Sequence, residues 1–187
     1  DDVESRGLGD VYKRQFLLFL AAFIKGVDEY QEMLRCCVSY PGNDHRLGGN
    51  EAPPAIISIF LGDELTAILD AIIQGTEYVD ITKKKLTIGV DTLPEIPQDT
   101  TDRNRTSPLA FTGNKFEFRM LGSSQSIASP NVVLNTIMTE ELRQFADILE
   151  KADDFQSALQ KLLHDTFTAH QRIIFNGNGY DDAWVQE

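Results

Sequence analysis

The longest regular pattern of apolar residues lies near the start of the chain and predicts a helix. Hydrophobic side chains recur there at spacings of four and three residues, which places them on one stripe of an α-helix. The stripe consists of Phe16, Leu20, Phe23, Val27, Tyr30 and Leu34. This pattern predicts a helix from Phe16 to about Arg35, followed by turn chemistry at Pro41-Gly42-Asn43-Asp44.

A continuous apolar run and a second helical pattern follow. Residues 55–61 are rich in isoleucine, which favours a short strand buried on both faces. Asp63 then stands where a helix N-cap is expected, and Gly75 stands where that helix should end. Its apolar face is predicted to hold Leu65, Ile68, Leu69 and Ile72. A short alternating strand is predicted at residues 86–90.

The second half of the chain predicts two long helices, with Asp153 and Asp154 placed to cap the later one. The residues expected to face the core are Val133, Ile137, Leu142, Phe145 and Leu149 in the first helix, and Phe155, Leu159, Leu162 and Leu163 in the second. Residues 176–179 predict a helix-terminating turn, and the polar tail after residue 180 predicts the start of another helix.

The first fifteen residues do not share this organisation. Residues 1–15 are polar, glycine-containing and aperiodic, with no apolar face to bury. We interpret them as a non-native or disordered leader, and we interpret residues 16–187 as one partial domain that continues upstream in the natural protein.

The segment Lys115-Phe116-Glu117-Phe118-Arg119-Met120 alternates charged and apolar residues, as a half-buried strand does. Its aromatic residues and Met120 would face a core, and its three charged residues would stand about 7 Å apart on the other face. Two interpretations remain open. The charges are either a solvated face with ion pairs, or Glu117 holds a hard cation and Arg119 an anion.

Composition and charge exclude several classes of partner. The chain has 187 residues, of which 42% are hydrophobic and 25% charged, as in a globular protein. A net charge of −12 argues against nucleic acid and against an anionic membrane surface. The longest apolar run, residues 16–24, is too short to span a bilayer. Two adjacent cysteines, Cys36 and Cys37, predict a reduced, cytoplasmic protein without a disulfide framework.

Polar segments in apolar surroundings supply the candidate chemistry. Each of three segments places an arginine near an acid, and arginine binds carboxylate and phosphate through a planar fork of donors. The pairs are Arg46 with Glu51, Arg105 with Asp102, and Arg119 with Glu117. A site for a carboxylate, phosphates and a divalent metal needs such groups. Spacing alone does not show whether the three segments converge.

The order of these segments resembles that of glutamine synthetases, and most of all the long, type III bacterial form. The segments that carry the resemblance are residues 43–54, 102–108 and 116–119. The shared phrases are Asn-Glu-Ala-Pro-Pro, Thr-Gly-Asn-Lys-Phe-Glu-Phe-Arg and Phe-Asn-Gly-Asn-Gly-Tyr. The resemblance covers Phe16 to Glu187. It implies an α+β fold in which antiparallel strands of a curved catalytic sheet are flanked by long helices, as the carboxyl-terminal part of the catalytic domain.

The resemblance also implies an activity. The family joins ammonia to the side-chain carboxylate of L-glutamate at the expense of ATP, through γ-glutamyl phosphate, with Mg²⁺ or Mn²⁺. It assembles into large rings, so copies of the same chain are expected partners. Two alternatives stay open: a ligase of the same superfamily that joins glutamate to a polyamine or another amine, and a catalytically idle structural homologue.

Site residues are carried over by position. Arg46 resembles the arginine that binds glutamate, and Glu51 resembles the acid of the closing loop, which helps bind ammonium and takes its proton. Arg105 resembles the arginine on the nucleotide phosphates. Glu117 resembles a metal ligand. Arg119 resembles the arginine that contacts glutamate and the transferred phosphoryl group.

Some positions depart from the family pattern. Common forms have one more residue between the arginine equated with Arg46 and the loop acid. They also have an arginine where this chain has Ala110. Lys115 is expected to supply that positive charge and to contact ATP. The family's other metal-binding acids, its metal-binding histidine and its β-grasp domain lie upstream, so the chain alone is expected to be inactive. His164 and His170 are expected to be surface or capping residues rather than ligands, whereas for His45, which borders the substrate loop, contact with a ligand and a structural role both stay open.

Overall fold

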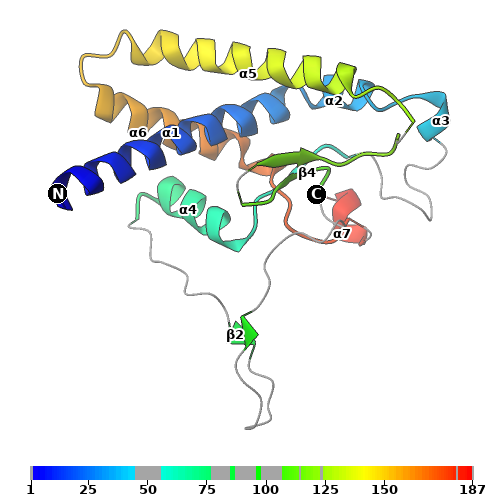
Figure 1. The fold of residues 1–187 in the computed structure, drawn as a ribbon, viewed down its shortest axis with the longest axis horizontal. Helices are drawn as coiled ribbons and strands as arrows, with labels where there is room; N and C mark the ends of the chain where they lie inside the picture. The colour runs from blue at the N-terminus through cyan, green and yellow to red at the C-terminus, as the bar shows by residue number, and fades with distance from the viewer. Residues whose placement is uncertain are drawn as a thin grey trace.

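The computed structural model describes a layer of long helices beside a small sheet (Figure 1). It describes the backbone of residues 2–44, 56–76, 85–86, 96–97, 107–113, 115–122, 124–179 and 181–186. The helices α1 (Asp2–Glu29), α5 (Ala128–Leu149) and α6 (Phe155–His170) pack against one another, and α4 (Asp63–Gln74) packs on α6. This helix content with a sheet confirms the α+β class.

The first predicted helix differs from α1 at both ends. The backbone is helical from Asp2 rather than from Phe16. It breaks at Tyr30, and the short helix α2 (Gln31–Cys36) continues the pattern. Leu20, Val27 and Leu34 of the predicted stripe are buried, whereas its first residue, Phe16, is exposed. That residues 1–15 are foreign to the domain stays a prediction. Pro41–Asp44, predicted as a turn, forms the short helix α3.

Helices α1 and α5 cross very closely at Gly26. A Cβ atom added to Gly26 would lie 2.2 Å from Cγ2 of Ile137 and 3.2 Å from Cγ of Glu141. Real Cβ contacts are never that short, so only glycine permits this approach. A glycine inside a helix lowers the stability of the helix. The close crossing that Gly26 permits offsets this loss because it buries Ile137 and Glu141.

Helix α4 confirms one predicted end and corrects the other. Gly75 follows its last residue in the left-handed conformation, with φ +65°, as predicted. Asp63 is the first helical residue, and the N-cap position belongs to Gly62, so the prediction of Asp63 as N-cap is wrong. No local side chain caps the helix. Leu69 is buried, and Leu65 and Ile72 are partly buried against the core, in line with the predicted apolar face.

Helices α5 and α6 follow the predicted pattern closely. Asp154 is the N-cap of α6, where its carboxylate accepts a hydrogen bond from the backbone nitrogen of Gln156 at 3.0 Å. Phe145 and Leu163 are buried as predicted. Phe155 is 49% exposed, so its predicted core position is wrong. It is the first residue of α6, and side chains there lean back past the end of the helix, away from the contact with α1.

The sheet has three short strands in the order β1-β4-β5. They are β1 (Ile59–Phe60), β4 (Leu109–Phe111) and β5 (Phe116–Phe118). Strands β4 and β5 are antiparallel, as predicted, but β1 pairs with β4 in parallel. The sheet is therefore mixed. The long connection through α4 explains this, because parallel neighbours need a crossover of a dozen residues or more.

The remaining elements are short. Strands β2 (Lys85–Leu86) and β3 (Ile96–Pro97) form a separate antiparallel pair. Most of the strand predicted at residues 86–90 lies outside the described residues. The 3₁₀ helix η1 (Gln171–Ile173) leads to α7 (Asp182–Gln186), which confirms the helix predicted at the end of the chain. Within the described residues, no helix is long and apolar enough to cross a membrane.

Candidate functional site

The hairpin of β4 and β5 positions the predicted charged segment. On one face of β5, the ring of Phe116 stacks on Phe23 of α1 with 4.0 Å between ring centroids, and it meets Phe111 of β4 at 5.2 Å. Phe118 is partly buried against the same core. The aromatic residues therefore anchor the strand to the helical layer. Because side chains alternate across a strand, the charged residues stand together on the other face.

Lys115, Glu117 and Arg119 form one ion-paired cluster. The guanidinium of Arg119 donates to Oε2 of Glu117 from Nε at 3.0 Å and from Nη2 at 2.8 Å. The ammonium of Lys115 lies 3.2 Å from Oε1 of the same carboxylate. The exposed fractions of the side chains are 64% for Lys115, 34% for Glu117 and 24% for Arg119. The cluster is thus half-sheltered and open to solvent on one side.

The two cations keep Glu117 ionised. Its pKa is lowered by the hydrogen bonds from Arg119 first and from Lys115 second, and partial burial opposes this shift. A carboxylate that stays ionised can ligate a hard cation, and the guanidinium of Arg119 carries donors besides the Nε and Nη2 that bond Glu117. The ion pairs of the plainer sequence interpretation are present, and they are also the groups that the binding interpretation needs.

The departure at Ala110 falls beside this cluster. Ala110 is buried and pairs with Glu117 in the register of β4 and β5, so their side chains stand on the same face of the sheet. The position where common family members carry an arginine therefore neighbours Glu117. Lys115 brings its charge to that carboxylate from the same strand. The position of Lys115 is thus consistent with its predicted replacement of the arginine that is absent at Ala110. That Lys115 contacts ATP stays a prediction.

Three predicted site residues, Arg46, Glu51 and Arg105, lie outside the described residues. His45 lies outside them as well. Within the described residues, no group of three or more histidines, cysteines or acids is placed to hold a metal ion. Glu117 is a single carboxylate, which fits the oxygen preference of Mg²⁺ and Mn²⁺ but supplies one ligand rather than a full shell.

The other two histidines lie away from this cluster. His164 is exposed, and its Nδ1 lies 3.2 Å from Asp165. Nδ1 of His170 lies 2.7 Å from Oδ2 of Asp28, a buried acid of α1. Arg172 donates to the same carboxylate from Nε, at 2.9 Å to Oδ1. This cluster was not predicted from the sequence, although an acid directly after Val27 in an apolar stripe is a signal for a buried, paired carboxylate.

Asn176 has a role that the sequence did not reveal. Its Oδ1 accepts from the backbone nitrogens of Leu61 at 3.0 Å and Gly62 at 3.1 Å, and its Nδ2 donates to Oγ1 of Thr66 at 2.9 Å. The side chain therefore caps the start of α4 from a distant part of the chain. The turn predicted at residues 176–179 does not terminate α6, which ends at His170.

Comparison with known proteins shows which sequences this chain resembles. Residues 158–187 match the family model described as the glutamine synthetase C-terminal domain. The chain is 50% identical over 175 residues to a type-3 glutamine synthetase of Dictyostelium discoideum. The chain is thus similar to a segment of a glutamine synthetase. It is also 43% identical to a glutamine synthetase of Bacteroides fragilis and 45% identical to one of Butyrivibrio fibrisolvens.

The match extends over nearly all of this chain but over only a small part of each glutamine synthetase. In each case it covers 92% of this chain but 24% or 25% of the relative. The chain thus spans about a quarter of the length of the glutamine synthetases it matches. The resemblance read from the motifs is confirmed as similarity to glutamine synthetases over most of this chain.

Proposed function

We propose that this chain supplies part of the active site of a glutamate–ammonia ligase, which makes glutamine from L-glutamate, ammonia and ATP. The observation that carries the proposal is the cluster of Lys115, Glu117 and Arg119, which gathers on one strand face within the shared phrase Thr-Gly-Asn-Lys-Phe-Glu-Phe-Arg. The sequence identity to named glutamine synthetases supports the same activity.

In this proposal the cluster of Lys115, Glu117 and Arg119 binds a metal cation and anionic substrate groups. Glu117 supplies one oxygen ligand to a divalent metal, Mg²⁺ or Mn²⁺, which would neutralise charge on the phosphates of ATP when bound. Arg119 uses its fork of donors to hold the carboxylate of glutamate and the transferred phosphoryl group. Lys115, the most exposed of the three, contacts the nucleotide phosphates as a point charge.

The remaining roles rest on the resemblance. Arg46 binds glutamate, Arg105 binds the nucleotide phosphates, and Glu51 takes a proton from ammonium on a loop that excludes water. The side-chain carboxylate of glutamate attacks the γ-phosphorus of ATP, and ADP leaves. Ammonia then attacks the acyl carbon, and phosphate leaves. Arg119 stays within reach of the phosphoryl oxygens in both steps, so its charge stabilises both transition states.

We further propose the setting of this segment. It belongs to the carboxyl-terminal part of the catalytic domain, its strands continue a curved sheet, and the full-length protein forms rings. Cys36 and Cys37 are free thiols, which supports a reducing, cytoplasmic location. Because the segment corresponds to about a quarter of its relatives, the chain alone is expected to form no glutamine.

The test compares two arginines that each pair with a glutamate. Arg119→Lys keeps the charge but loses the fork. Arg143→Lys does the same on the exposed face of α5, where Arg143 pairs with Glu140. In the full-length protein, Arg119→Lys should slow glutamine formation by about 100-fold, the scale of losing one donor aimed at transition-state charge. Arg143→Lys should leave the rate unchanged.

Three outcomes would contradict the proposal or part of it. Equal rates for the wild type and Arg119→Lys would overturn the assignment of Arg119. Product formed from a polyamine and not from ammonia would replace the ligase proposal by that of a glutamate–amine ligase. Glutamine formed by the purified 187-residue chain would refute the expectation that further parts are needed.

A further inference from the structure

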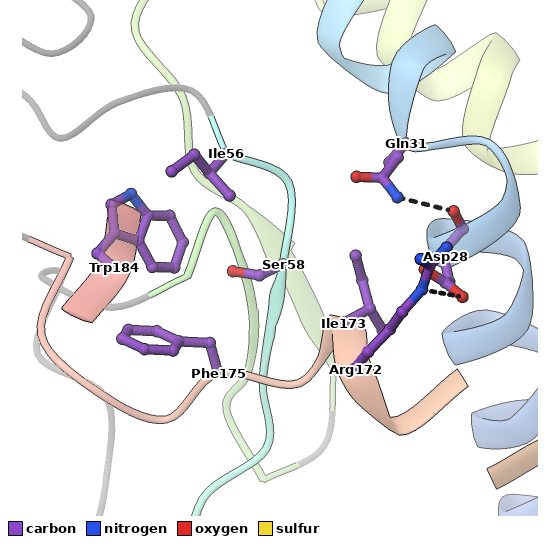
Figure 2. Close-up of a pocket in the computed structure, with 8 residues that line it drawn as sticks. All are labelled: Asp28, Gln31, Ile56, Ser58, Arg172, Ile173, Phe175 and Trp184. Atoms are coloured by element: carbon purple, nitrogen blue, oxygen red, sulfur yellow. Dashed lines mark hydrogen bonds and ion pairs between the residues drawn. The ribbon is translucent and has the colours of Figure 1, made fainter. Parts of the chain in front are cut away.

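A cavity of about 160 Å³ opens between the end of α1 and the carboxyl-terminal loop (Figure 2). Its lining comes from four separate stretches of the chain. The residues are Asp28, Gln31, Ile56, Ser58, Arg172, Ile173, Phe175 and Trp184. None of them belongs to the proposed glutamine synthetase site.

The walls of the cavity are fixed by contacts between these stretches. Oγ of Ser58 donates to Oγ of Ser107 at 2.7 Å, and Ser107 donates to the carbonyl oxygen of Phe175 at 2.7 Å. The backbone nitrogen of Phe175 donates to the carbonyl oxygen of Ile59 at 2.9 Å. Ser58 and Ser107 are both buried. The apolar wall is therefore held by a buried network and is preformed.

One end of the cavity is apolar. Ile56, Phe175 and Trp184 line it, and the rings of Phe175 and Trp184 meet edge to face with 4.8 Å between centroids. In Figure 2 these two rings stand on one side of the cavity, opposite Gln31 and Asp28. An apolar wall of this kind favours hydrocarbon or an aromatic ring.

The other end of the cavity is polar and carries compensated charge. Nε of Arg172 donates to both oxygens of Asp28, at 2.9 Å and 3.2 Å, so the two charges cancel. Nε2 of Gln31 donates to the carbonyl oxygen of Asp28 at 3.1 Å. No donor among the described residues reaches Oε1 of Gln31. Figure 2 shows this oxygen turned away from Asp28, toward the space between the walls.

We propose that this cavity binds a small uncharged amphiphile with a hydrogen-bonding head and a body the size of one ring. A cavity of roughly 150 Å³ accommodates a benzene ring, so the volume suits one six-membered ring and little more. The head donates to Oε1 of Gln31 and accepts from the guanidinium of Arg172. The body lies against Phe175 and Trp184. A primary carboxamide on a ring has this chemistry.

The charges at the polar end select against ions. A carboxylate head would approach the buried Asp28, and an ammonium head would approach Arg172. Asp28 is buried and Arg172, whose side chain is 72% exposed, is already bonded to it, so an ion gains little there for the hydration that it loses on the side of Asp28. A neutral head makes the same hydrogen bonds without that cost.

The test uses three ring compounds that differ in the charge of the head: benzamide, benzoate and benzylammonium. Trp184 is the only tryptophan of the chain, so its indole N–H signal and its fluorescence report on the cavity alone. Benzamide should shift the indole signal saturably, with a Kd on the order of 1 mM for so small a ligand. Benzoate and benzylammonium should bind at least about tenfold more weakly.

Two variants and a matched control locate the site. Gln31→Leu removes the acceptor and should weaken benzamide binding about fivefold, the scale of one hydrogen bond. Gln171→Leu changes an exposed glutamine of η1 outside the cavity and should have no effect. Ile56→Phe fills the space and should abolish the shift, which keeps the test decisive if Gln31→Leu does not fold.

Three results would overturn the proposal: no saturable shift with benzamide up to about 20 mM (far above the expected Kd), equal binding of all three compounds, or unchanged binding by both Gln31→Leu and Ile56→Phe. Equal binding of the three would mean that the apolar wall takes any ring and that the polar end selects nothing.

Discussion

Both hydrogen bonds from Arg119 to Glu117 end on the same carboxylate oxygen, Oε2, with Nε at 3.0 Å and Nη2 at 2.8 Å. Among the described residues, the contact of the other oxygen, Oε1, is with the ammonium of Lys115, at 3.2 Å. Oε2 is therefore held by the rigid, planar guanidinium of Arg119, and Oε1 is contacted by the flexible side chain of Lys115. In the proposed metal site, Oε1 would be the ligand oxygen, because the flexible side chain of Lys115 can turn away from it.

The unequal bonding predicts unequal effects on the titration of Glu117. Arg119→Leu should raise its pKa more than Lys115→Leu does, because the hydrogen bonds from Arg119 are the largest cause of the lowered pKa. The carboxyl signal of Glu117 in a ¹³C NMR titration measures this. A larger shift from Lys115→Leu would contradict the geometry. With its pKa lowered, Glu117 stabilises the fold above its ordinary pKa, and this contribution is lost as the pH falls through the lowered value.

Glu141 on α5 predicts the opposite dependence on pH. Its side chain is 0% exposed, Oε2 is bonded by Lys25, and Oε1 has no partner within the described residues. Burial is the main cause of its raised pKa, against the effect of Lys25. A raised pKa means that the folded state binds the proton more tightly. The stability contribution is then full below the ordinary value of 4.5 and is lost as the pH rises through the raised value.

Its neighbour Glu140 provides the control. The fork of Arg143 lowers the pKa of Glu140 to about 2, so its contribution is constant above about pH 5. Between pH 4 and 8, urea unfolding should show Glu141→Gln gaining stability relative to the wild type as the pH rises. The difference between Glu140→Gln and the wild type should stay flat from pH 5 upward. A flat difference for Glu141→Gln would show that Lys25 fully compensates the buried charge.

Asn176 predicts a long-range capping effect on α4. Asn176→Ala leaves the backbone nitrogens of Leu61 and Gly62 without their acceptor and should lower the free energy of unfolding by about 1–2 kcal/mol. Asn176→Asp keeps the acceptor oxygen and should lower the free energy of unfolding by less than Asn176→Ala does. Asn135→Ala, on the exposed face of α5, should be neutral. Unchanged stability of Asn176→Ala in chemical unfolding would show that α4 does not depend on this cap.

Gly26 predicts a steric effect at the crossing of α1 and α5. Gly26→Ala places Cβ 2.2 Å from Cγ2 of Ile137, so it should destabilise the fold by about 1–3 kcal/mol despite the better helix propensity of alanine. Gly42→Ala, where nothing lies within 4 Å, should be close to neutral. Ile137→Ala should partly relieve the cost in the double variant. Additive effects of Gly26→Ala and Ile137→Ala would argue against direct contact.

What could be predicted from the sequence was local. The cap at Asp154, the left-handed end at Gly75 and the alternation around Glu117 each involve residues a few positions apart. Such patterns are fixed by the periods of helices and strands. The motifs added the family, because each phrase combines residue types that no period requires.

What the sequence did not reveal depends on partners far apart in the chain. His170 and Asp28 are 142 positions apart, and Asn176 caps a helix that starts more than a hundred positions earlier. Nothing in the periodicity of α1 shows which side chain will meet Asp28. The parallel pairing of β1 with β4 was missed for the same reason, since it depends on the path of the chain through α4.

The central claim is that Glu117 ligates a divalent metal in a glutamine synthetase, and the dependence of activity on Mg²⁺ tests it most directly. In the full-length protein, Glu117→Gln should raise the Mg²⁺ concentration needed for half-maximal glutamine formation by at least about tenfold, because a neutral amide replaces a charged ligand. Glu150→Gln, on an exposed residue after α5, should leave it unchanged. An unchanged Mg²⁺ dependence for Glu117→Gln, with wild-type activity, would contradict the account.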